Sequence, residues 1–343
     1  MTADAKAAPV LDVRDLHVEF TTHGGVVKAV RGASFSVAAG KTLAIVGESG
    51  CGKSVSVQSI MGLIPMPPGR ITGGAALLHG TDIVRRKIVD GDDVRGNRIG
   101  MIFQDPMSSL NPTMKIGDQI AETLEVHRGY SRAKARARAV ELLTQVQIPE
   151  AEERSQQYPF AFSGGMLQRA MIAMAIACEP SVLIADEPTT ALDVTIQAQI
   201  LDLLAELQRK NGMAIVLITH DLAVVARMAD EVAVMYAGEI VERGAVEDVF
   251  DQPAHPYTLG LRGALPSRST ERAGLNPIEG APPDLFAPPT GCGYFARCAH
   301  AMRVCEQHHP QQLPVAAGHA ARCWLHAPDA PRTHPAIQHR VRR

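Results

Sequence analysis

The chain has 343 residues, enough for two domains and a large hydrophobic core. Hydrophobic residues make up 46% of it and charged residues 20%, and its net charge of −2 argues against nucleic acid as a partner, since proteins that bind nucleic acid carry a clear basic excess. No apolar run approaches the roughly 18 residues that span a bilayer, and residues 1–9 lack the charged-then-apolar plan of a signal peptide. We therefore expect a cytosolic protein, unless a partner holds it at a membrane.

The chain begins with two β-like segments. Residues 10–20 and 26–37 alternate between apolar and polar side chains and are separated by Thr-Thr-His-Gly-Gly, which predicts an antiparallel pair of strands. Phe20 is a candidate for stacking on an adenine base, because a flat apolar ring suits that face. An ordinary core aromatic explains Phe20 equally well.

Residues 47–54 follow, reading Gly-Glu-Ser-Gly-Cys-Gly-Lys-Ser, and fit the P-loop pattern. They lie between an apolar run of strand length, residues 42–46, and a helical segment, residues 55–63. Glycines allow a tight turn whose N–H groups point at phosphate oxygens. Lys53 would reach the β- and γ-phosphates, and the Ser54 hydroxyl would ligate Mg²⁺. This stretch predicts a nucleoside triphosphate site.

Two further features precede the middle of the chain. Residues 99–103 form a short apolar strand followed by Gln104, and a polar amide at a strand's carboxyl end in a P-loop fold lies near the nucleotide crevice. Gln104 is therefore a candidate to ligate Mg²⁺ or orient water, although a strand-terminal glutamine alone is weak evidence. Residues 116–157 then show a helical pattern, with Ser131 as an N-cap, and predict a helical insertion between sheet strands.

A second helix N-terminus suited to phosphate begins at Ser163. Ser163 is a good N-cap for a helix of small and apolar residues, and Gly164 and Gly165 permit close approach of a ligand. One nucleotide cannot use both phosphate sites of one chain. The pair therefore suggests a dimer that shares nucleotides across its interface.

Charged residues follow two more strands. The run 182–186 ends in Asp186, which suits Mg²⁺, and Glu187, which can polarise an attacking water. Asp193 then leads into an amphipathic helix over residues 194–210. The next strand, residues 213–218, is followed by His220, a candidate to bind a γ-phosphate and to hold Glu187 and water in line.

Four of the six cysteines lie in the last fifth of the chain, spaced C-x5-C-x6-C-x17-C at Cys292, Cys298, Cys305 and Cys323. In a reducing cytosol, this crowding suggests metal ligation over disulfides. These gaps are not the tight C-x2-C pairs of most zinc sites, and four thiolates without a nearby fixed histidine ligand favour an iron–sulfur cluster. Zinc remains an alternative because of His300, His308, His309 and His319, as do unliganded thiols. We interpret Cys51 as a small filler in the P-loop and Cys178 as a core residue.

In order and spacing, these motifs resemble the nucleotide-binding subunit of an ABC transporter across residues 11–249. Residues 47–54 look like Walker A, Gln104 like the Q-loop, Ser163–Gln168 like the signature motif, Asp186–Glu187 like Walker B, Asp193 like the D-loop, and His220 like the switch histidine. The resemblance implies head-to-tail dimers that bind ATP between one P-loop and the other subunit's Ser163. One departure is Phe-Ser-Gly-Gly-Met at residues 162–166, where the family usually has Leu-Ser-Gly-Gly-Gln. We do not expect this change to abolish hydrolysis.

The resemblance also implies the residues of the site. Catalysis would involve Glu187, His220 and Gln104, and Mg²⁺ would be held by Ser54, Gln104 and Asp186. The implied ATP contacts are Phe20, Gly47, Glu48, Ser49, Gly50, Cys51, Gly52, Lys53, Ser54, Val55, Gln104, Ser163, Gly164, Gly165, Asp186 and Asp193.

The chain also resembles the oligopeptide/dipeptide importer branch, in particular its D-type dipeptide ATPase subunit. The resemblance lies in residues 102–112, 184–195 and 255–258 and in the Cys-rich C-terminal part, called the tail below (residues 266–343). This branch implies a heterodimer with a second ATPase, two membrane permeases, an extracytoplasmic binding protein, and a location on the cytoplasmic face of the inner membrane. It also implies a [4Fe–4S] centre on the four tail cysteines. Nickel, glutathione and other peptide-like importers share these motifs.

We therefore expect an α/β fold in which residues 1–265 form an ABC nucleotide-binding domain. This domain would contain a RecA-like P-loop core, an antiparallel β subdomain and a helical subdomain at about 105–180, and residues 266–343 would form a small Cys-rich regulatory module reached through a Pro/Gly-rich linker. The alternatives are a soluble ABC ATPase of translation or DNA repair, and a redox-sensing regulator built on the tail. Translation-type relatives usually carry two cassettes, whereas the chain has one P-loop, and repair-type relatives need a coiled-coil insertion, for which no sustained heptads are present.

Overall fold

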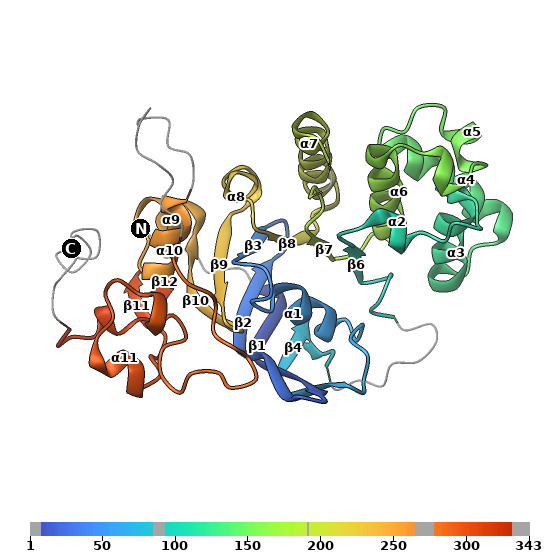
Figure 1. Ribbon diagram of the computed structural model, residues 1–343. Helices are drawn as coiled ribbons and strands as arrows, with labels where there is room; N and C mark the ends of the chain where they lie inside the picture. Colours follow the sequence, from blue (N-terminus) through green and yellow to red (C-terminus); the bar gives the residue numbers. More distant parts are fainter. Residues whose placement is uncertain (1–7, 85–92, 191, 265–277, 331–343) are drawn as a thin grey trace. The chain divides into compact units, whose positions relative to one another are not determined.

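The computed structural model describes residues 8–84, 93–190, 192–264 and 278–330 (Figure 1). The chain divides into two compact units, which we describe one at a time. The first comprises Met1–Leu11, Ser36–Thr42 and Leu77–Ile218, and the second comprises Asp12–Phe35, Leu43–Ala76 and Thr219–Arg343.

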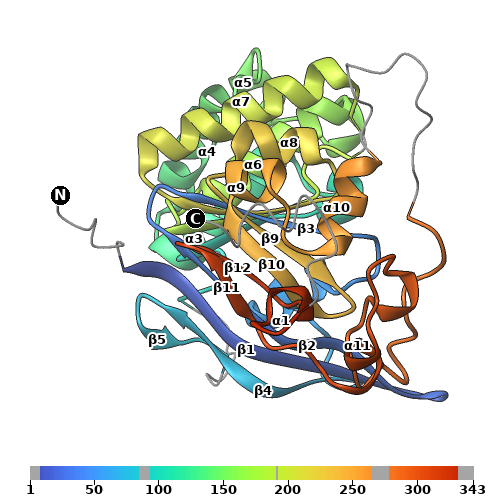
Figure 2. The ribbon, with the colours of Figure 1, turned by 90° about the vertical axis from the view of Figure 1, so that its left-hand side faces the viewer.

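An antiparallel sheet begins the chain, as predicted. Strands β1 (Pro9–Thr22) and β2 (Gly25–Ala38) are joined by a two-residue turn, and with β4 (Gly69–Leu78) and β5 (Thr81–Asp82) they form a sheet of order β2-β1-β4-β5 (Figure 2). Alternate residues at the end of β2 are buried, namely Ala33, Phe35 and Val37. This period of two is why the segment forms a half-buried strand.

The second unit holds five strands of the larger sheet, in the order β11-β12-β10-β9-β3. Their bounds are β3 Thr42–Val46, β9 Glu231–Tyr236, β10 Glu239–Ala245, β11 Leu313–Ala316 and β12 His319–Ala321. β3 and β9 are parallel, whereas the C-terminal strand β12 pairs antiparallel with β10. The C-terminal strands β11 and β12 thus belong to the same sheet as the P-loop strand β3.

The tail also shares a hydrophobic core with that strand. Tyr294 belongs to the same cluster of buried side chains as Val46, Tyr236 and Tyr257.

The helices of this unit are α1 Lys53–Ile60, α8 Leu222–Met228, α9 Val246–Asp251, α10 Pro256–Gly263 and α11 Arg303–Gln307, with short 3-10 turns at Phe295–Arg297 and Trp324–His326.

The first unit holds three parallel strands in the order β8-β7-β6. β6 (Ile99–Ile102), β7 (Val182–Asp186) and β8 (Ala214–Thr219) are buried along their whole length, as expected for short apolar runs in a parallel sheet. α7 (Val194–Asn211) follows β7 and is capped by Asp193, whose carboxylate accepts the N–H groups of Thr195 and Ile196.

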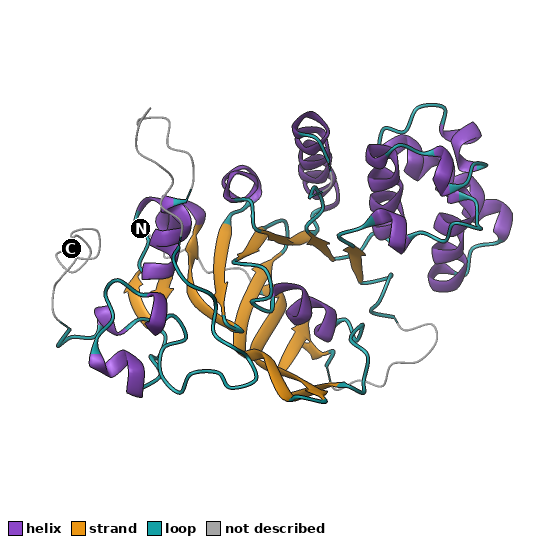
Figure 3. Ribbon diagram, in the orientation of Figure 1, coloured by secondary structure: helices purple, strands orange, loops and turns teal. Residues whose placement is uncertain are grey.

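The helical pattern predicted for residues 116–157 is confirmed. A group of helices lies between β6 and β7 in the sequence: α2 Pro106–Ser109, α3 Ile116–Arg128, α4 Arg132–Gln145, α5 Ala151–Ser155 and α6 Gly164–Ile176, with a 3-10 turn at Pro159–Ala161 (Figure 3). Ser131 caps α4 as predicted, since its hydroxyl accepts the N–H of Lys134. Among the described helices, none is both long and apolar enough to cross a membrane.

Candidate nucleotide-binding site

The P-loop lies between β3 and α1, directly against neighbouring backbone. A Cβ at Gly47, where φ is +155°, would lie 2.1 Å from the carbonyl oxygen of Met235 on β9. A Cβ at Gly52, where φ is +105°, would lie 2.5 Å from the carbonyl oxygen of Ala29 on β2. Only glycine fits at either position, because both the space and the backbone conformation exclude a side chain.

The Lys53 side chain folds back into the curve of this loop. Its ammonium donates to the carbonyl oxygens of Gly47, at 2.8 Å, and Glu48, at 2.9 Å. Lys53 is also the first residue of α1, so its charge adds to the positive end of the helix dipole. The loop is therefore electrostatically suited to an anionic group such as a phosphate. Cys51 is buried beside Lys53, as the filler interpretation requires, and burial raises the pKa of its thiol.

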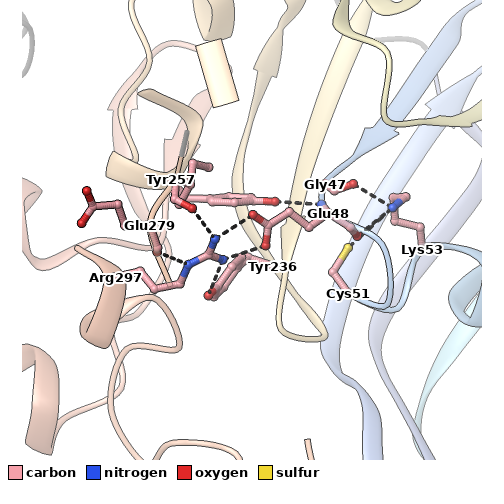
Figure 4. Close-up of polar contacts among 9 residues, drawn as sticks. Gly47, Glu48, Cys51, Lys53, Tyr236, Tyr257, Glu279 and Arg297 are labelled. Atoms are coloured by element: carbon pink, nitrogen blue, oxygen red, sulfur yellow. Dashed lines mark hydrogen bonds and ion pairs between the residues drawn. The ribbon is translucent and has the colours of Figure 1, made fainter. Parts of the chain in front are cut away.

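Glu48 is held from outside the loop by residues that the sequence did not indicate (Figure 4). Its N–H donates to the Tyr257 hydroxyl at 2.8 Å, and its carboxylate accepts hydrogen bonds of 2.7 and 3.0 Å from the two terminal nitrogens of Arg297. These bonds to Glu48 raise the pKa of Arg297 above its ordinary value. Arg297 is 249 residues from Glu48 along the chain, so no local pattern could have identified this contact.

In the first unit, parallel register brings Gln104 and Glu187 together. Ile102 of β6 lies opposite Ala185 of β7, so the residues that follow the two strands emerge at the same sheet edge. The Glu187 carboxylate accepts hydrogen bonds of 2.9 Å from the Gln104 amide and from the Thr190 hydroxyl.

The backbone also fixes Glu187. Its φ of +48° is a left-handed conformation, which costs a residue with a side chain about 1–3 kcal/mol, and its N–H donates to the Ile218 carbonyl at 2.9 Å. Strain of this size persists only where the surrounding structure determines it, and such positions cluster at functional sites. Asp186, one residue earlier, ends β7 and is 3% exposed.

The signature segment begins α6 as predicted. The Ser163 hydroxyl accepts the N–H of Met166, and Ser163 and Gly164 are exposed at the start of this 13-residue helix. Gly165 packs closely, because a Cβ there would lie 3.0 Å from the Ile196 side chain. Asp193 uses one carboxylate oxygen to cap α7. Its contact with a nucleotide stays a prediction.

His220 and Phe20 belong to the second unit. His220 is exposed and lies between the end of β8 and Asp221, which caps α8. Phe20 lies on β1 and packs against Gly69, where an added Cβ would approach its ring to 3.0 Å. Adenine stacking by Phe20 and phosphate binding by His220 remain predictions.

The four tail cysteines converge on one small cavity, whose other lining residues include His255, Tyr294 and Trp324. Desolvation by burial raises the pKa of Cys292 to about 11 and that of Cys323 to about 12. Two of the four histidines that left zinc open are engaged elsewhere: His309 bonds to Glu239 and His319 to Glu242, each at 2.7 Å. Within the described ranges, no group of three or more His, Cys, Asp or Glu residues is arranged to hold a metal ion. Cys178 is buried in the core as predicted.

A P-loop after a buried strand, paired carboxylates at the end of another strand and a serine-capped glycine helix define an ATP-binding cassette. The ABC transporter family matches residues 30–190, and the family described as oligopeptide/dipeptide transporter, C-terminal region, matches residues 241–305. The chain is 54% identical to the dipeptide transport ATP-binding protein DppD of Bacillus subtilis (strain 168), over 92% of this chain and 94% of that one. It is 53% identical to the oligopeptide transport ATP-binding protein OppD of the same organism, over 95% and 91% of the two chains.

Solved structures agree with this assignment. A dimeric ATP-binding cassette in a post-hydrolysis state, bound to ADP and Pi, matches with a TM-score of 0.60 and 26% identity, over 69% of this chain and 98% of that one. The chain belongs to the ATP-binding subunits of ABC transporters, in the oligopeptide/dipeptide group. The predicted α/β P-loop cassette fold is confirmed, and the protein is an ATPase of this family.

Burial of His255 predicts how stability depends on pH. His255 is 1% exposed, and burial lowers its pKa from 6.5 to about 4, although Glu242 opposes the shift. Between these values the unfolded chain binds a proton that the folded chain excludes, so the free energy of unfolding falls by about 1.4 kcal/mol per pH unit as pH drops from 6.5 towards 4. Urea unfolding across this range measures the slope.

The matched control is His255→Asn. The His255 ring nitrogen caps α10 by accepting the N–H of Tyr257, and asparagine can supply that acceptor without titrating. This variant should lose the His255 part of the slope. Identical pH profiles for the two proteins would contradict the assignment.

Proposed function

We propose that this subunit powers the import of peptides, dipeptides or short oligopeptides, across the cytoplasmic membrane from the cytoplasmic face of the inner membrane. The observation that carries the proposal is similarity to DppD and OppD over nearly the whole chain, including the oligopeptide/dipeptide C-terminal region. The same machinery could import nickel, glutathione or another peptide-like solute, which is the alternative to be tested. A soluble ABC ATPase of translation or repair is the more distant one.

Hydrolysis would use groups that the fold already orients. Glu187 would polarise the attacking water, and its hydrogen bonds to Gln104 and Thr190 support this role because they hold the carboxylate in one orientation. Lys53 would bind the β- and γ-phosphates, and His220 would contact the γ-phosphate. Mg²⁺, held by Ser54, Asp186 and Gln104, would neutralise phosphate charge.

The proposed assembly is a head-to-tail dimer with a second, homologous ATPase, in which each signature serine completes the partner's site. Ser163 and Gly164 support this arrangement, because they leave the start of α6 exposed to a ligand. Closure of the dimer on two ATP molecules and its reopening after hydrolysis would drive two permease subunits. An extracytoplasmic binding protein would deliver the substrate.

Exposed apolar side chains in the first unit support docking of the permeases near Gln104. Phe103 precedes Gln104, and Met107, in the short helix α2, is 57% exposed. Phe160 is 77% exposed and stacks on Tyr158, with ring centroids 5.6 Å apart. Exposed aromatic and methionine side chains are typical of protein interfaces.

We further propose that residues 266–343 act as a regulatory module and that Cys292, Cys298, Cys305 and Cys323 bind a structural [4Fe–4S] cluster. Their convergence on one cavity supports the cluster. Iron–sulfur clusters are held by four thiolates around a polynuclear core, which differs from the compact ligand group of a single ion. The cluster would contribute folding energy without taking part in turnover.

Glu187→Gln tests the assignment of the general base. We expect ATP affinity within about threefold of wild type and turnover lower by a factor of at least about 100, because the carboxylate acts only in the chemical step. The matched control is Glu179→Gln, since Glu179 is a left-handed glutamate in the same unit, paired with Arg138. Wild-type turnover in Glu187→Gln would overturn the assignment.

Co-purification tests the transport function. An affinity-tagged chain, extracted from membranes in mild detergent, should bring with it two multi-span permeases and a second ATPase, and vesicles containing the complex should accumulate a radiolabelled dipeptide. Accumulation of nickel or glutathione instead would replace the substrate but keep the machinery. Recovery of ribosomes or DNA-bound proteins alone would refute the transport proposal.

Anaerobic purification tests the cluster. We expect about four iron and four sulfide per chain, lost in Cys305→Ser and retained in the control Cys178→Ser, whose thiol is buried and does not line the cavity. Stoichiometric zinc, or the absence of both iron and sulfide, would contradict the proposal.

A further inference from the structure

On its outer side, the P-loop contacts residues from the C-terminal part of the chain, Tyr257 and Arg297 (Figure 4). The Arg297 guanidinium makes a two-pronged contact with the Glu48 carboxylate, at 2.7 and 3.0 Å. Tyr257, in α10, accepts the N–H of Glu48. Both the side chain and the backbone of Glu48 are therefore anchored to residues that lie more than 200 positions later in the sequence.

Arg297 is itself held rigidly. Its Nε donates to the Glu279 carbonyl at 2.9 Å, and one terminal nitrogen donates to the Ile278 carbonyl at 3.2 Å. The other terminal nitrogen donates to the Tyr236 hydroxyl at 3.2 Å. Its side chain is only 6% exposed, so its contact with Glu48 is less screened than an ion pair on an open surface.

Arg297 and Tyr257 together form a clamp on Glu48, and Glu48 connects this clamp to the inner side of the P-loop. Its carbonyl oxygen accepts a hydrogen bond from the Lys53 ammonium, and the neighbouring Gly47 carbonyl accepts another. A shift of the Glu48 peptide would therefore move an acceptor that orients Lys53. A loop that is already ordered before the ligand arrives does not incur the ordering cost during binding.

We propose that Arg297, assisted by Tyr257, is a positioning residue that holds the P-loop in its nucleotide-binding shape, so that the C-terminal segment sets nucleotide affinity. This inference rests on the proposed nucleotide site at residues 47–54. Arg297 directly precedes Cys298, which lines the cysteine cavity, so one short segment serves both the cavity and the loop. The tail thereby acts on ATP binding from outside the phosphate site.

The test is the affinity of the full-length chain for a fluorescent ADP analogue. Arg297→Met should weaken binding about tenfold, and Arg297→Lys should recover only part of the loss, because lysine cannot form the two-pronged contact. Tyr257→Phe, which keeps the buried ring, should weaken binding in the same direction by a smaller factor. The matched control is Arg322→Met, because Arg322 also ties the tail to β10, through the Ile240 carbonyl, without touching the P-loop.

Two further measurements separate positioning from general stability. In the assembled transporter, Arg297→Met should raise the KM for ATP about tenfold while kcat at saturating ATP stays within twofold, since Arg297 touches no reacting group. Glu48→Gln should weaken binding, and the double variant should be no weaker than the worse single variant, because both changes break one contact.

The outcomes distinguish this inference from the nucleotide site itself. Failure of the wild-type chain to bind nucleotide, or unchanged binding in Lys53→Ala, would refute the site. If Lys53→Ala abolishes binding while Arg297→Met leaves affinity within twofold of wild type, only the clamp is refuted. Equal losses in Arg297→Met and Arg322→Met would also refute it, because they would indicate a general effect of loosening the tail.

Discussion

The P-loop depends on close backbone packing that leaves no room for a side chain at two of its glycines. Gly47 lies so close to the Met235 carbonyl, and Gly52 so close to the Ala29 carbonyl, that a single methyl group would collide with either. This packing places the Lys53 ammonium beside the carbonyl oxygens of Gly47 and Glu48. The positive charge and the N-terminus of α1 consequently act at one point, which is the electrostatic requirement for binding a triphosphate.

In the first unit, the arrangement of the strands orients a carboxylate. Three fully buried parallel strands end together, so polar residues that follow them emerge at a common edge. Gln104 and Glu187 meet there, and the left-handed backbone at Glu187 directs its carboxylate towards Gln104 and Thr190. A rigid apolar sheet thus fixes the orientation of a carboxylate that must stay polar and accessible.

The C-terminal segment is integrated with the unit that carries the P-loop. β12 pairs with β10, and Tyr294 packs in the same core as Tyr236 and Tyr257. At the centre of this attachment is the fully buried Glu242, whose carboxylate accepts the N–H groups of Ala254 and His255 and contacts His319. A buried carboxylate with this many partners is tolerated because each partner offsets part of its desolvation.

Local sequence patterns were sufficient to predict much of the secondary structure and the P-loop of this protein. The P-loop, the buried strands and the caps at Ser131 and Ser163 follow from apolar runs, glycine spacing and side-chain capping, which act over a few residues. The sequence by itself also identified the family, because its motifs are short and ordered. Tertiary structure alone decided that Arg297 and Tyr257 hold Glu48, and that His309 and His319 bond to carboxylates. Those contacts join residues far apart in the chain, and their partners are selected by how strands pair and cores pack, which no local spacing encodes.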